Sequence, residues 1–561
     1  MRNFKTLLVI LLAVFVASCG SLKMPDPYHV TPNPLVNKGG KVTFTVNDTI
    51  PPKGFPKKAV VKLEPYLKYE GGSLSLKPMM LKGESAEGDG TVINAKMGAP
   101  ITYTDVFDYK PEMQVSELWV KVTSFKGTEG TVIADVKIAE GIVITSTRVG
   151  HGENVQLAAH MYEKETIITT AAKLYFEYNK SNYSSSLKLN KDSKKDLDSL
   201  KEFIGKGWKI KDININAWAS PEGELTLNQE LSDERGATAK KYIKNQVKRL
   251  TKSKEEVAIN VVAKGADYDG FMNALNSSDI KDKNKISNVI KSQANKSERE
   301  QQIRNMTVIY KEVEDMLSVL RRSEISVNCY EPKRTDEEIA RMSISAPDSL
   351  SVKELLYAAT MTQDLNVQLS IYKATIKNND QCWRAYNNAA AVDIKLGNTD
   401  EAAQYLEKAN TLKAGQGEVE NNMGVLAAWN KDYEAAKTHY DAAGSKGVDV
   451  TYNMGVVKMV NGDYQGAEKA FATKTCDYNL ALAQLENGKT ADATKTLDCA
   501  QKSGEAYYLL AIIGARTNNT TMVIDNLRNA IDAVPAYKAE AAKDKEFANF
   551  ASNTDFQSLV K

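Results

Sequence analysis

Apolar and polar residues alternate in the first part of this chain and follow a helical spacing in its last part. Between residues 41 and 150, short runs such as Val42–Val46 and Leu118–Val122 alternate in character, and Gly and Pro residues separate them. A period of two is typical of half-buried strands joined by turns. No helical period interrupts these runs, so the pattern predicts an all-β sandwich over residues 41–160.

The middle of the chain combines both periods. Ile213–Asn216 alternates in the manner of a strand, and residues 238–250 carry apolar side chains at a helical spacing. Residues 217–237 therefore join a strand to a helix through a loop, which is a place where folds often present side chains and N–H groups to a ligand. We predict an α+β domain over residues 165–330 with a candidate binding loop at this junction.

Beyond residue 335, small residues recur as they do in repeated helix pairs. The repeats are marked by Ala390, Gly424, Gly455, Ala481 and Ala511. A second small or apolar residue follows each of them twelve positions later, and the intervals between repeats are 34, 31, 26 and 30 residues. This pattern resembles the tetratricopeptide repeat and implies an all-α solenoid over residues 335–561 that binds segments of other proteins. The interval of 26 residues predicts a shortened second helix in the third repeat.

The N-terminus carries a targeting signal. Two basic residues precede an apolar run from Leu7 to Val16, which is too short to span a membrane. The letters Val-Ala-Ser-Cys that end at Cys19 resemble the bacterial lipobox, which implies a signal peptide over residues 1–18 and lipidation of Cys19. The alternative is an ordinary signal peptide with a chance cysteine. Gly20 is not the aspartate that holds many lipoproteins at the inner membrane, so we expect the outer membrane.

A tether is expected after the lipidated cysteine. Four prolines lie among polar residues over residues 19–40, a composition that favours an extended and poorly packed spacer. The segment lacks the early acidic cluster that resembles a surface-export tag in some Bacteroidota lipoproteins. The periplasmic face of the outer membrane is therefore slightly favoured over the cell surface.

The central junction resembles the OmpA-like domain, which in many Gram-negative envelope proteins grips the diaminopimelate of peptidoglycan. Asn228, Leu231, Ser232 and Arg235 fall where that family has its Asn-x-x-Leu-Ser-x-x-Arg signature. The resemblance implies that Asn228 and Arg235 are candidate contacts to peptidoglycan. In the family, the Arg of this signature pairs with a carboxylate of diaminopimelate.

One position of the candidate site departs from the family. An Asp that meets the ammonium group of diaminopimelate is expected fifteen residues before the Arg, and Ser220 stands there. A serine hydroxyl supplies no negative charge, so a charge-assisted hydrogen bond worth about 1.5–3 kcal/mol is lost. Glu222 is the alternative acid, in a shifted position. A purely structural role for Arg235 is the other alternative, and we expect weak or absent binding to peptidoglycan.

Composition and motif content exclude several function classes. The chain has 73 Lys and Arg residues against 71 Asp and Glu residues, without the basic surplus that nucleic-acid binding usually needs. The four histidines lack the spacing of a metal site, and no phosphate loop, nucleophile elbow or zinc-helix motif occurs. We therefore expect no enzyme, no catalytic residue, no metal, no cofactor and no nucleic-acid partner.

Four cysteines remain after Cys19. Cys476 is expected near the start of the first helix of the fourth repeat and Cys499 near the end of the second helix. Because the two ends meet in an antiparallel helix pair, a disulfide between them is possible. The alternative is that both are small apolar residues in the seam between the helices. Cys329 and Cys382 have no comparable argument and are left unpaired.

Together these features resemble a multidomain outer-membrane lipoprotein of Bacteroidota type. Its expected order is an all-β sandwich, a variant α+β OmpA-like domain and an all-α tetratricopeptide solenoid. We expect a non-enzymatic scaffold that binds envelope proteins through its repeats, in β-barrel insertion, secretion or fimbrial machinery. One alternative is a peptidoglycan-binding lipoprotein that links the outer membrane to the cell wall. The other is an enzyme or substrate-capture lipoprotein at the surface.

Overall fold

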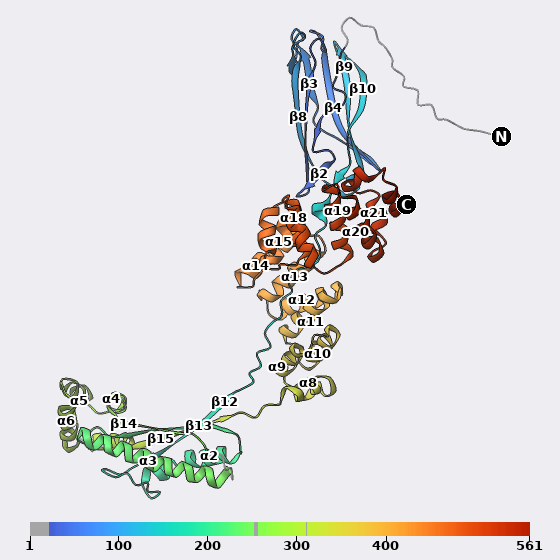
Figure 1. Cartoon of the computed structure of the whole chain (residues 1–561). Coiled ribbons are helices and arrows are strands. Elements are labelled where there is room, and N and C mark those ends of the chain that lie inside the picture. Colours follow the sequence, from blue (N-terminus) through green and yellow to red (C-terminus); the bar gives the residue numbers. More distant parts are fainter. Residues whose placement is uncertain (1–21, 252–255, 310) are drawn as a thin grey trace. The chain divides into compact units, whose positions relative to one another are not determined.

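The computed structural model describes residues 22–251, 256–309 and 311–561 (Figure 1). The chain forms two compact units, of which the first combines the chain up to His160 with the chain from Ala359 onwards. The second unit comprises Met161–Ala358 and is inserted between the two parts of the first. The predicted signal peptide and Cys19 lie outside the described residues. Within the described ranges, no helix has both the length and the apolar character needed to cross a membrane.

The N-terminal part of the first unit is a sandwich of two β-sheets. One sheet contains β1 (Val30–Thr31), β2 (Leu35–Lys38), β3 (Lys41–Ile50), β8 (Ala99–Asp108) and β11 (Ile142–Val143). The other contains β4 (Val60–Tyr69), β5 (Gly72–Ser75), β6 (Met79–Gly83), β7 (Thr91–Ile93), β9 (Ser116–Lys126) and β10 (Glu129–Glu140). Alternate side chains of β3, β4 and β9 form one apolar core, in which Phe44, Leu67 and Val122 are buried. The sheet-rich N-terminal region that the alternating pattern predicts is confirmed.

Both ends of the sandwich differ from the predicted range of 41–160. The tether predicted over residues 19–40 is wrong for residues 30–31 and 35–38, which form strands β1 and β2 because Val30 and Leu35 bury their side chains in the sandwich core. At the other end the last strand stops at Val143. Residues 148–158 form neither strand nor helix, and they lie on the helical repeats of the same unit.

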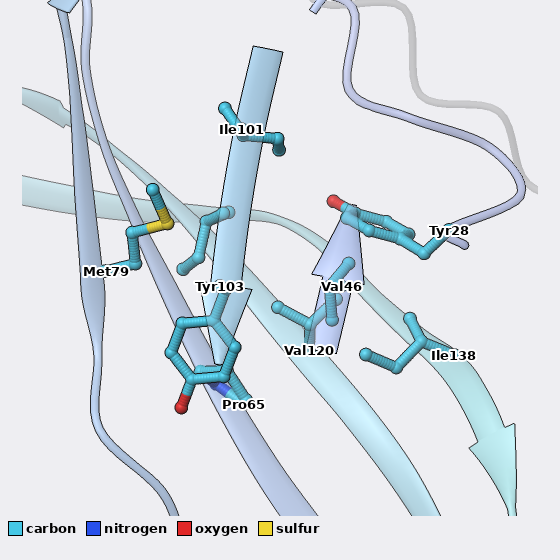
Figure 2. A pocket seen from close by; sticks show the side chains of 9 residues that line it. Tyr28, Val46, Pro65, Met79, Ile101, Tyr103, Val120 and Ile138 are labelled. Atoms are coloured by element: carbon cyan, nitrogen blue, oxygen red, sulfur yellow. The ribbon is translucent and has the colours of Figure 1, made fainter. Parts of the chain in front are cut away.

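The sandwich core encloses one small apolar cavity, lined among others by Tyr28, Pro65, Met79 and Ile138 (Figure 2). Its volume is about 20 Å³, which is the space of roughly one water molecule. Burial, followed by the charge of Asp48, raises the pKa of the Tyr28 phenol to about 12. The cavity is too small for a ligand, so we interpret it as a packing gap.

The second unit is built on a four-stranded sheet with the order β12-β15-β13-β14. These strands are β12 (Ile167–Tyr175), β13 (Ile210–Ala219), β14 (Ile259–Ala266) and β15 (Arg322–Tyr330). Only β13 and β14 are parallel to each other, and β15 is antiparallel to both of its neighbours. Helices α2 (Lys194–Gly205) and α3 (Leu225–Thr251) pack on the sheet and share its apolar core (Figure 1).

Further helices complete the second unit. They are α1 (Lys188–Asp192), α4 (Tyr268–Ser277), α5 (Lys283–Lys291), α6 (Lys296–Ile309), α7 (Lys311–Leu320), α8 (Asp336–Ser345) and α9 (Val352–Ala358). Helices α4 to α7 form a second small core around Phe271 and Leu317. The predicted repeat domain begins at residue 335, whereas the division between the two units places α8 and α9 in the second unit.

The C-terminal part of the first unit is a stack of helix pairs. The pairs are α11 (Trp383–Leu396) with α12 (Thr399–Leu412), α13 (Gly417–Trp429) with α14 (Tyr433–Ser445), α15 (Thr451–Val460) with α16 (Tyr464–Phe471), α17 (Tyr478–Glu486) with α18 (Thr490–Cys499), and α19 (Gly504–Arg516) with α20 (Thr520–Ala533). Helix α10 (Leu365–Asn378) precedes them, and α21 (Tyr537–Ala541) and α22 (Thr554–Val560) follow. The predicted C-terminal all-helical repeat region is confirmed.

Small residues mark the repeats because the two helices of a pair approach closely at these positions. A Cβ atom on Gly424 would lie 2.6 Å from the ring of Tyr440, and one on Gly455 would lie 2.7 Å from the ring of Phe471. The second helix of the third repeat, α16, has eight residues, whereas α14 has thirteen. The short interval in the sequence thus corresponds to a short helix.

A disulfide joins Cys476, which lies just before α17, to Cys499, the last residue of α18. Their Cα atoms are 5.2 Å apart, within the range that a disulfide tolerates. Cys329 and Cys382 are free and buried. The bridge therefore ties the residue before α17 to the end of α18 and encloses the helix pair of the fourth repeat.

Replacing Cys476 and Cys499 by serine is expected to lower the free energy of unfolding of the first unit by about 3 kcal/mol, because the bridge closes a loop of 23 residues. Thermal unfolding with and without a reductant measures the effect. The reductant should destabilise the wild type and leave the double variant unchanged. Equal sensitivity of both proteins would contradict this assignment.

Candidate functional site

Four asparagines occupy the same place in the first helix of four successive repeats. They are Asn388 on α11, Asn422 on α13, Asn453 on α15 and Asn479 on α17. Each lies two positions before the small residue that marks its repeat, so they share the intervals of 34, 31 and 26 residues. All four are at most 2% exposed. Because stacked repeats superpose equivalent positions, these side chains form a row along the solenoid.

This row binds the backbone of residues 150–158 of the same chain. Each asparagine accepts a hydrogen bond from the N–H of one residue and donates one to the C=O of that same residue. The reciprocal pairs are Asn479 with Gly150, Asn453 with Asn154, Asn422 with Gln156, and Asn388 with Ala158. The eight donor-to-acceptor distances lie between 2.7 and 3.1 Å.

The bound segment runs opposite to the order of the repeats. Gly150 lies on the fourth repeat, and Ala158 lies on the first. Asn154, Gln156 and Ala158 are alternate residues, as expected for an extended backbone that presents one edge to the helices. We call residues 148–158 the strap.

Two further asparagines extend the row into a network. Asn421 donates to the carbonyl of Asn154 at 2.8 Å, and Asn387 donates to the carbonyl of Gln156 at 3.0 Å. Neighbouring repeats are also linked directly, because Asn422 donates to the side chain of Asn387 at 3.0 Å. The network therefore couples the repeats to one another through the strap.

The chemistry of the asparagine side chain explains this arrangement. One amide offers a donor and an acceptor, which complement the C=O and N–H of one residue in any extended peptide. A buried amide without partners costs about 1–3 kcal/mol per unmade hydrogen bond. The row of Asn388, Asn422, Asn453 and Asn479 is thus a site for an extended backbone, whatever its side chains.

Two glycines of the strap pass close to tyrosines. A Cβ atom on Gly150 would lie 3.0 Å from Cδ1 of Tyr478, and one on Gly152 would lie 2.5 Å from the hydroxyl oxygen of Tyr452. Lys474 lies over the Tyr452 ring at 3.7 Å and donates to the carbonyl of Gly152 at 3.2 Å. The position of Gly152 therefore admits no side chain unless Tyr452 moves.

An acidic side chain of the strap is also bound. Glu153 accepts a hydrogen bond from Nε1 of Trp429 at 3.1 Å and from the N–H of Gly152 at 3.0 Å. Burial raises the pKa of the Glu153 carboxyl, and the indole donor opposes that rise. The repeats therefore bind one acidic side chain of the strap, at Trp429, in addition to its backbone.

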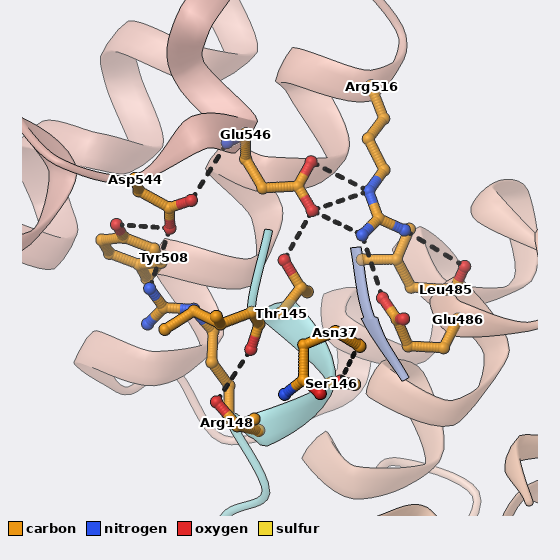
Figure 3. Close-up of polar contacts among 12 residues, drawn as sticks. Asn37, Thr145, Ser146, Arg148, Leu485, Glu486, Tyr508, Arg516, Asp544 and Glu546 are labelled. Carbon is orange, nitrogen blue, oxygen red and sulfur yellow. Dashed lines mark hydrogen bonds and ion pairs between the residues drawn. The ribbon is translucent and has the colours of Figure 1, made fainter. Parts of the chain in front are cut away.

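Arg148 fixes the N-terminal end of the strap (Figure 3). Its guanidinium lies 4.0 Å from the ring centre of Tyr508 and pairs with Glu540 at 2.7 Å and Asp544 at 2.9 Å. The carbonyl of Arg148 accepts a hydrogen bond from Tyr478 at 2.9 Å. A planar cation stacked on an aromatic ring between two carboxylates is a strong and specific contact.

The residues before the strap connect the sandwich to the last repeats (Figure 3). Thr145 donates to Glu546 at 2.5 Å, and Ser146 donates to the carbonyl of Asn37 at 2.9 Å. Arg516 pairs with the same Glu546 at 2.5 Å and with Glu486 at 2.9 Å. Polar contacts thus hold the sandwich end of this unit against its repeat end.

The candidate peptidoglycan contacts lie in the second unit, around the short loop between β13 and α3. Ser220 donates to Glu222 at 2.7 Å, and both are buried. Arg321, which precedes β15, donates to Ser220 at 3.1 Å and to Glu222 at 2.8 Å. Asn228 donates to the carbonyl of Gly223 at 2.8 Å, which closes the loop onto the helix. The acid of the loop is therefore already paired with a cation of the chain.

Arg235 is 1% exposed and directed to the backbone. It donates to the carbonyls of Glu177 at 3.3 Å, Lys180 at 3.0 Å and Trp218 at 3.0 Å. Burial, followed by the charge of Arg321, lowers the pKa of Arg235 to about 10. In this arrangement Arg235 holds the segment after β12 to the end of strand β13, which is the structural alternative for this residue.

Purified full-length protein is expected to remain in the supernatant when mixed with peptidoglycan sacculi. The reason is that Arg235 is bonded to three carbonyls and Glu222 is paired with Arg321. A sedimentation assay tests this, with an OmpA-like domain that retains the loop Asp as the positive control. Sedimentation of the protein at the level of that control would contradict the expectation.

The sequence pointed to some of these residues and not to others. The strap lies within residues 41–160, the range predicted as the sandwich, and the pattern of the sequence did not indicate Arg321 as a partner of Glu222. The asparagine row could have been recognised in the sequence. An Asn lies two positions before the small residue in four repeats, and Leu509 lies at that position in the fifth. Within the described residues, no group of three or more His, Cys, Asp or Glu side chains could hold a metal ion.

No family model matches this chain, and no curated protein matches it. Among solved structures it is similar to a tetratricopeptide repeat protein from Parabacteroides merdae, with 13% identity, a TM-score of 0.28, and coverage of 46% of this chain and 96% of that chain. It is also similar to PilW, a type IV pilus biogenesis factor (14% identity, TM-score 0.27, 41% and 100% coverage), and to Pseudomonas aeruginosa pilF (12% identity, TM-score 0.26, 40% and 98% coverage). The helix pairs described above, rather than these low-scoring likenesses, characterise the C-terminal region as a tetratricopeptide-type solenoid.

Proposed function

We propose that this protein is a non-enzymatic scaffold that holds other proteins of the cell envelope through its repeat solenoid. The observation that carries the proposal is the row of buried asparagines, which binds an extended backbone through paired hydrogen bonds. Amides suit recognition and positioning, since they have no proton to transfer near neutral pH. The carboxylates at the end of the row are paired with Arg148 and Arg516.

The finer assignment follows from the resemblances in the sequence. We place the chain at the outer membrane, anchored by lipid on Cys19 and facing the periplasm, in β-barrel insertion, secretion or fimbrial machinery. The second unit is a variant OmpA-like domain in this proposal. Its parallel pair β13–β14 and the position of Arg235 after β13 support that assignment. The internal pairing of Glu222 disfavours a role as a cell-wall clamp.

Crosslinking in living cells tests the scaffold. A photoreactive residue is introduced at Lys408 or Lys437, which are exposed on second helices of the repeats, and at Lys96 of the sandwich as a control. We expect discrete protein adducts at the repeat positions and not at the control position. Absence of protein adducts along the repeats, in cells that contain the intact protein, would overturn the proposal.

The variant Cys19→Ala is expected to leave the protein soluble or unprocessed, because acyl chains supply the membrane anchor and roughly 0.8 kcal/mol comes from each buried CH₂. Fractionation of cells followed by mass spectrometry of the mature N-terminus measures the outcome. Cys329→Ala is the control and should remain with the membrane. Correctly processed Cys19→Ala protein in the outer membrane at the wild-type level would refute the lipidation site.

A further inference from the structure

The strap is held mainly by its backbone, and Val149 and Val155 also pack against the hydrophobic cores of the repeats. Among residues 148–158 only Ala158 is buried, and Leu157 remains 40% exposed. The specific side-chain contacts lie at the N-terminal end, around Arg148 and Glu153. Contacts of this kind are reproduced by any other peptide that is extended and carries the same few groups.

The asparagine row cannot remain empty without a large cost. Asn387, Asn421 and Asn422 are 0% exposed with the strap in place, and their amides hydrogen-bond to the strap and to other asparagines of the network, including Asn388 and Asn453. If the strap left, these buried amides would lose hydrogen bonds that water cannot fully replace. Another extended backbone in the place of the strap restores these hydrogen bonds, so exchange costs less than departure of the strap alone.

We propose that the strap is an exchangeable internal ligand, and that an extended segment of a partner protein binds the asparagine row by displacing it. This inference rests on the proposed scaffold function and specifies its ligand. The strap then occupies the row in the free protein. Binding of a partner segment replaces the strap and releases it.

The contacts of the strap define the class of segment that competes. An arginine enters the place between Tyr508, Glu540 and Asp544. A glycine follows two positions later, where Tyr478 makes a Cβ atom tight, and another four positions later, where a Cβ atom fits only if Tyr452 moves. An acid that reaches Trp429 comes next. The expected pattern is Arg-x-Gly-x-Gly-Glu followed by residues of any type in an extended conformation.

The competing strap sets the affinity scale. A covalently attached ligand acts at an effective concentration on the order of millimolar, so a free peptide must overcome that advantage. Variants that weaken the strap without changing the asparagines should bind the peptide more tightly. Gly152→Ala does this through the 2.5 Å approach to Tyr452, and Arg148→Ala does it by removing the end contact.

The probe is a fluorescent synthetic peptide with the sequence of residues 146–160, titrated against full-length protein by fluorescence anisotropy. The double variant Gly152→Ala with Arg148→Ala is expected to bind it at least tenfold more tightly than the wild type. Circular dichroism confirms that the variant retains its helices. The control Lys96→Ala, at an exposed position of the sandwich, should bind like the wild type.

A change in the peptide tests the site without altering the protein. N-methylation of the backbone amides at the positions of Asn154 and Gln156 removes two N–H donors. Asn453 and Asn422 accept the hydrogen bonds of these two N–H groups. We expect at least a tenfold loss of binding to the double variant. N-methylation at the positions of Val155 and Leu157 is the matched control and should cost much less.

Three outcomes overturn the inference. The first is failure of the unmodified peptide to bind the folded double variant, and the second is equal binding to the double variant and the wild type. The third is equal binding of the peptides methylated at the two sets of positions. If crosslinks to envelope proteins still form at Lys408 or Lys437, the scaffold function survives while the exchange of the strap is rejected.

Discussion

Replacing Arg321 by methionine is expected to destabilise the second unit by about 3–5 kcal/mol, one of the two largest effects we predict. Arg321 and Glu222 are buried with side chains 5% and 4% exposed and 2.8 Å apart. Removal of the cation leaves a carboxylate in a place that water does not reach, and one buried charge without its partner carries a cost of this size. Urea unfolding, with hydrogen exchange to assign the transition to residues 161–358, measures the loss.

The double variant Arg321→Met with Glu222→Gln separates this effect from a loss of packing. It should regain most of the stability, because no unpaired charge remains. Arg341→Met is the control for removal of a cation, since Arg341 is exposed in the same unit. If Arg321→Met and the double variant were equally unstable, the packing of the Arg321 side chain rather than its charge would explain the loss.

Replacing Asn422 and Asn453 together by leucine is expected to destabilise the first unit by about 4 kcal/mol. The N–H groups of Asn154 and Gln156 lose their acceptors, and the links from these two side chains to Asn387 and Asn421 are broken. At about 1–3 kcal/mol for each buried group left unpaired, the sum is of this order. Leucine is tolerated at this place of a repeat in principle, since Leu509 occupies it in the fifth.

Two measurements check this prediction. Thermal unfolding should show the loss for the double variant and none for Asn529→Leu, an exposed asparagine on α20. Amide hydrogen exchange of the wild type should show protection at residues 150, 154, 156 and 158, which lose it in the double variant. Fast exchange at these positions in the wild type would mean that the strap does not rest on the row in solution.

The periodicity of the sequence was sufficient to predict those elements that pack one side against a single neighbouring layer or helix. Val42–Val46 alternates because one side of β3 meets the sandwich core, and Gly424 is small because Tyr440 packs against it. Local spacing therefore predicted the sheet-rich start and the helix pairs. Strands β1 and β2 were missed because they are only two and four residues long and lie among prolines, where composition favours a tether.

The asparagine row shows where prediction of the candidate site stopped. Its intervals of 34, 31 and 26 residues are those of the repeats, so the row could be recognised from the sequence. Its ligand could not, because Gln156 lies 266 residues before Asn422 and the strap has no apolar period of its own. A segment that is recognised by its backbone leaves little trace in its side chains.

The sequence by itself determined the types of element, the repeat intervals and the presence of an arginine fifteen residues after Ser220. Only the tertiary structure decided what these residues do. Arg235 donates hydrogen bonds to three carbonyls, and Glu222 pairs with Arg321, which lies 99 residues away in the chain. These polar groups of the loop and of α3 therefore have their partners within the chain. The physical reason is that the partner of a buried polar group is chosen by the fold that brings donors and acceptors together, while periodicity reports only which side of an element is apolar.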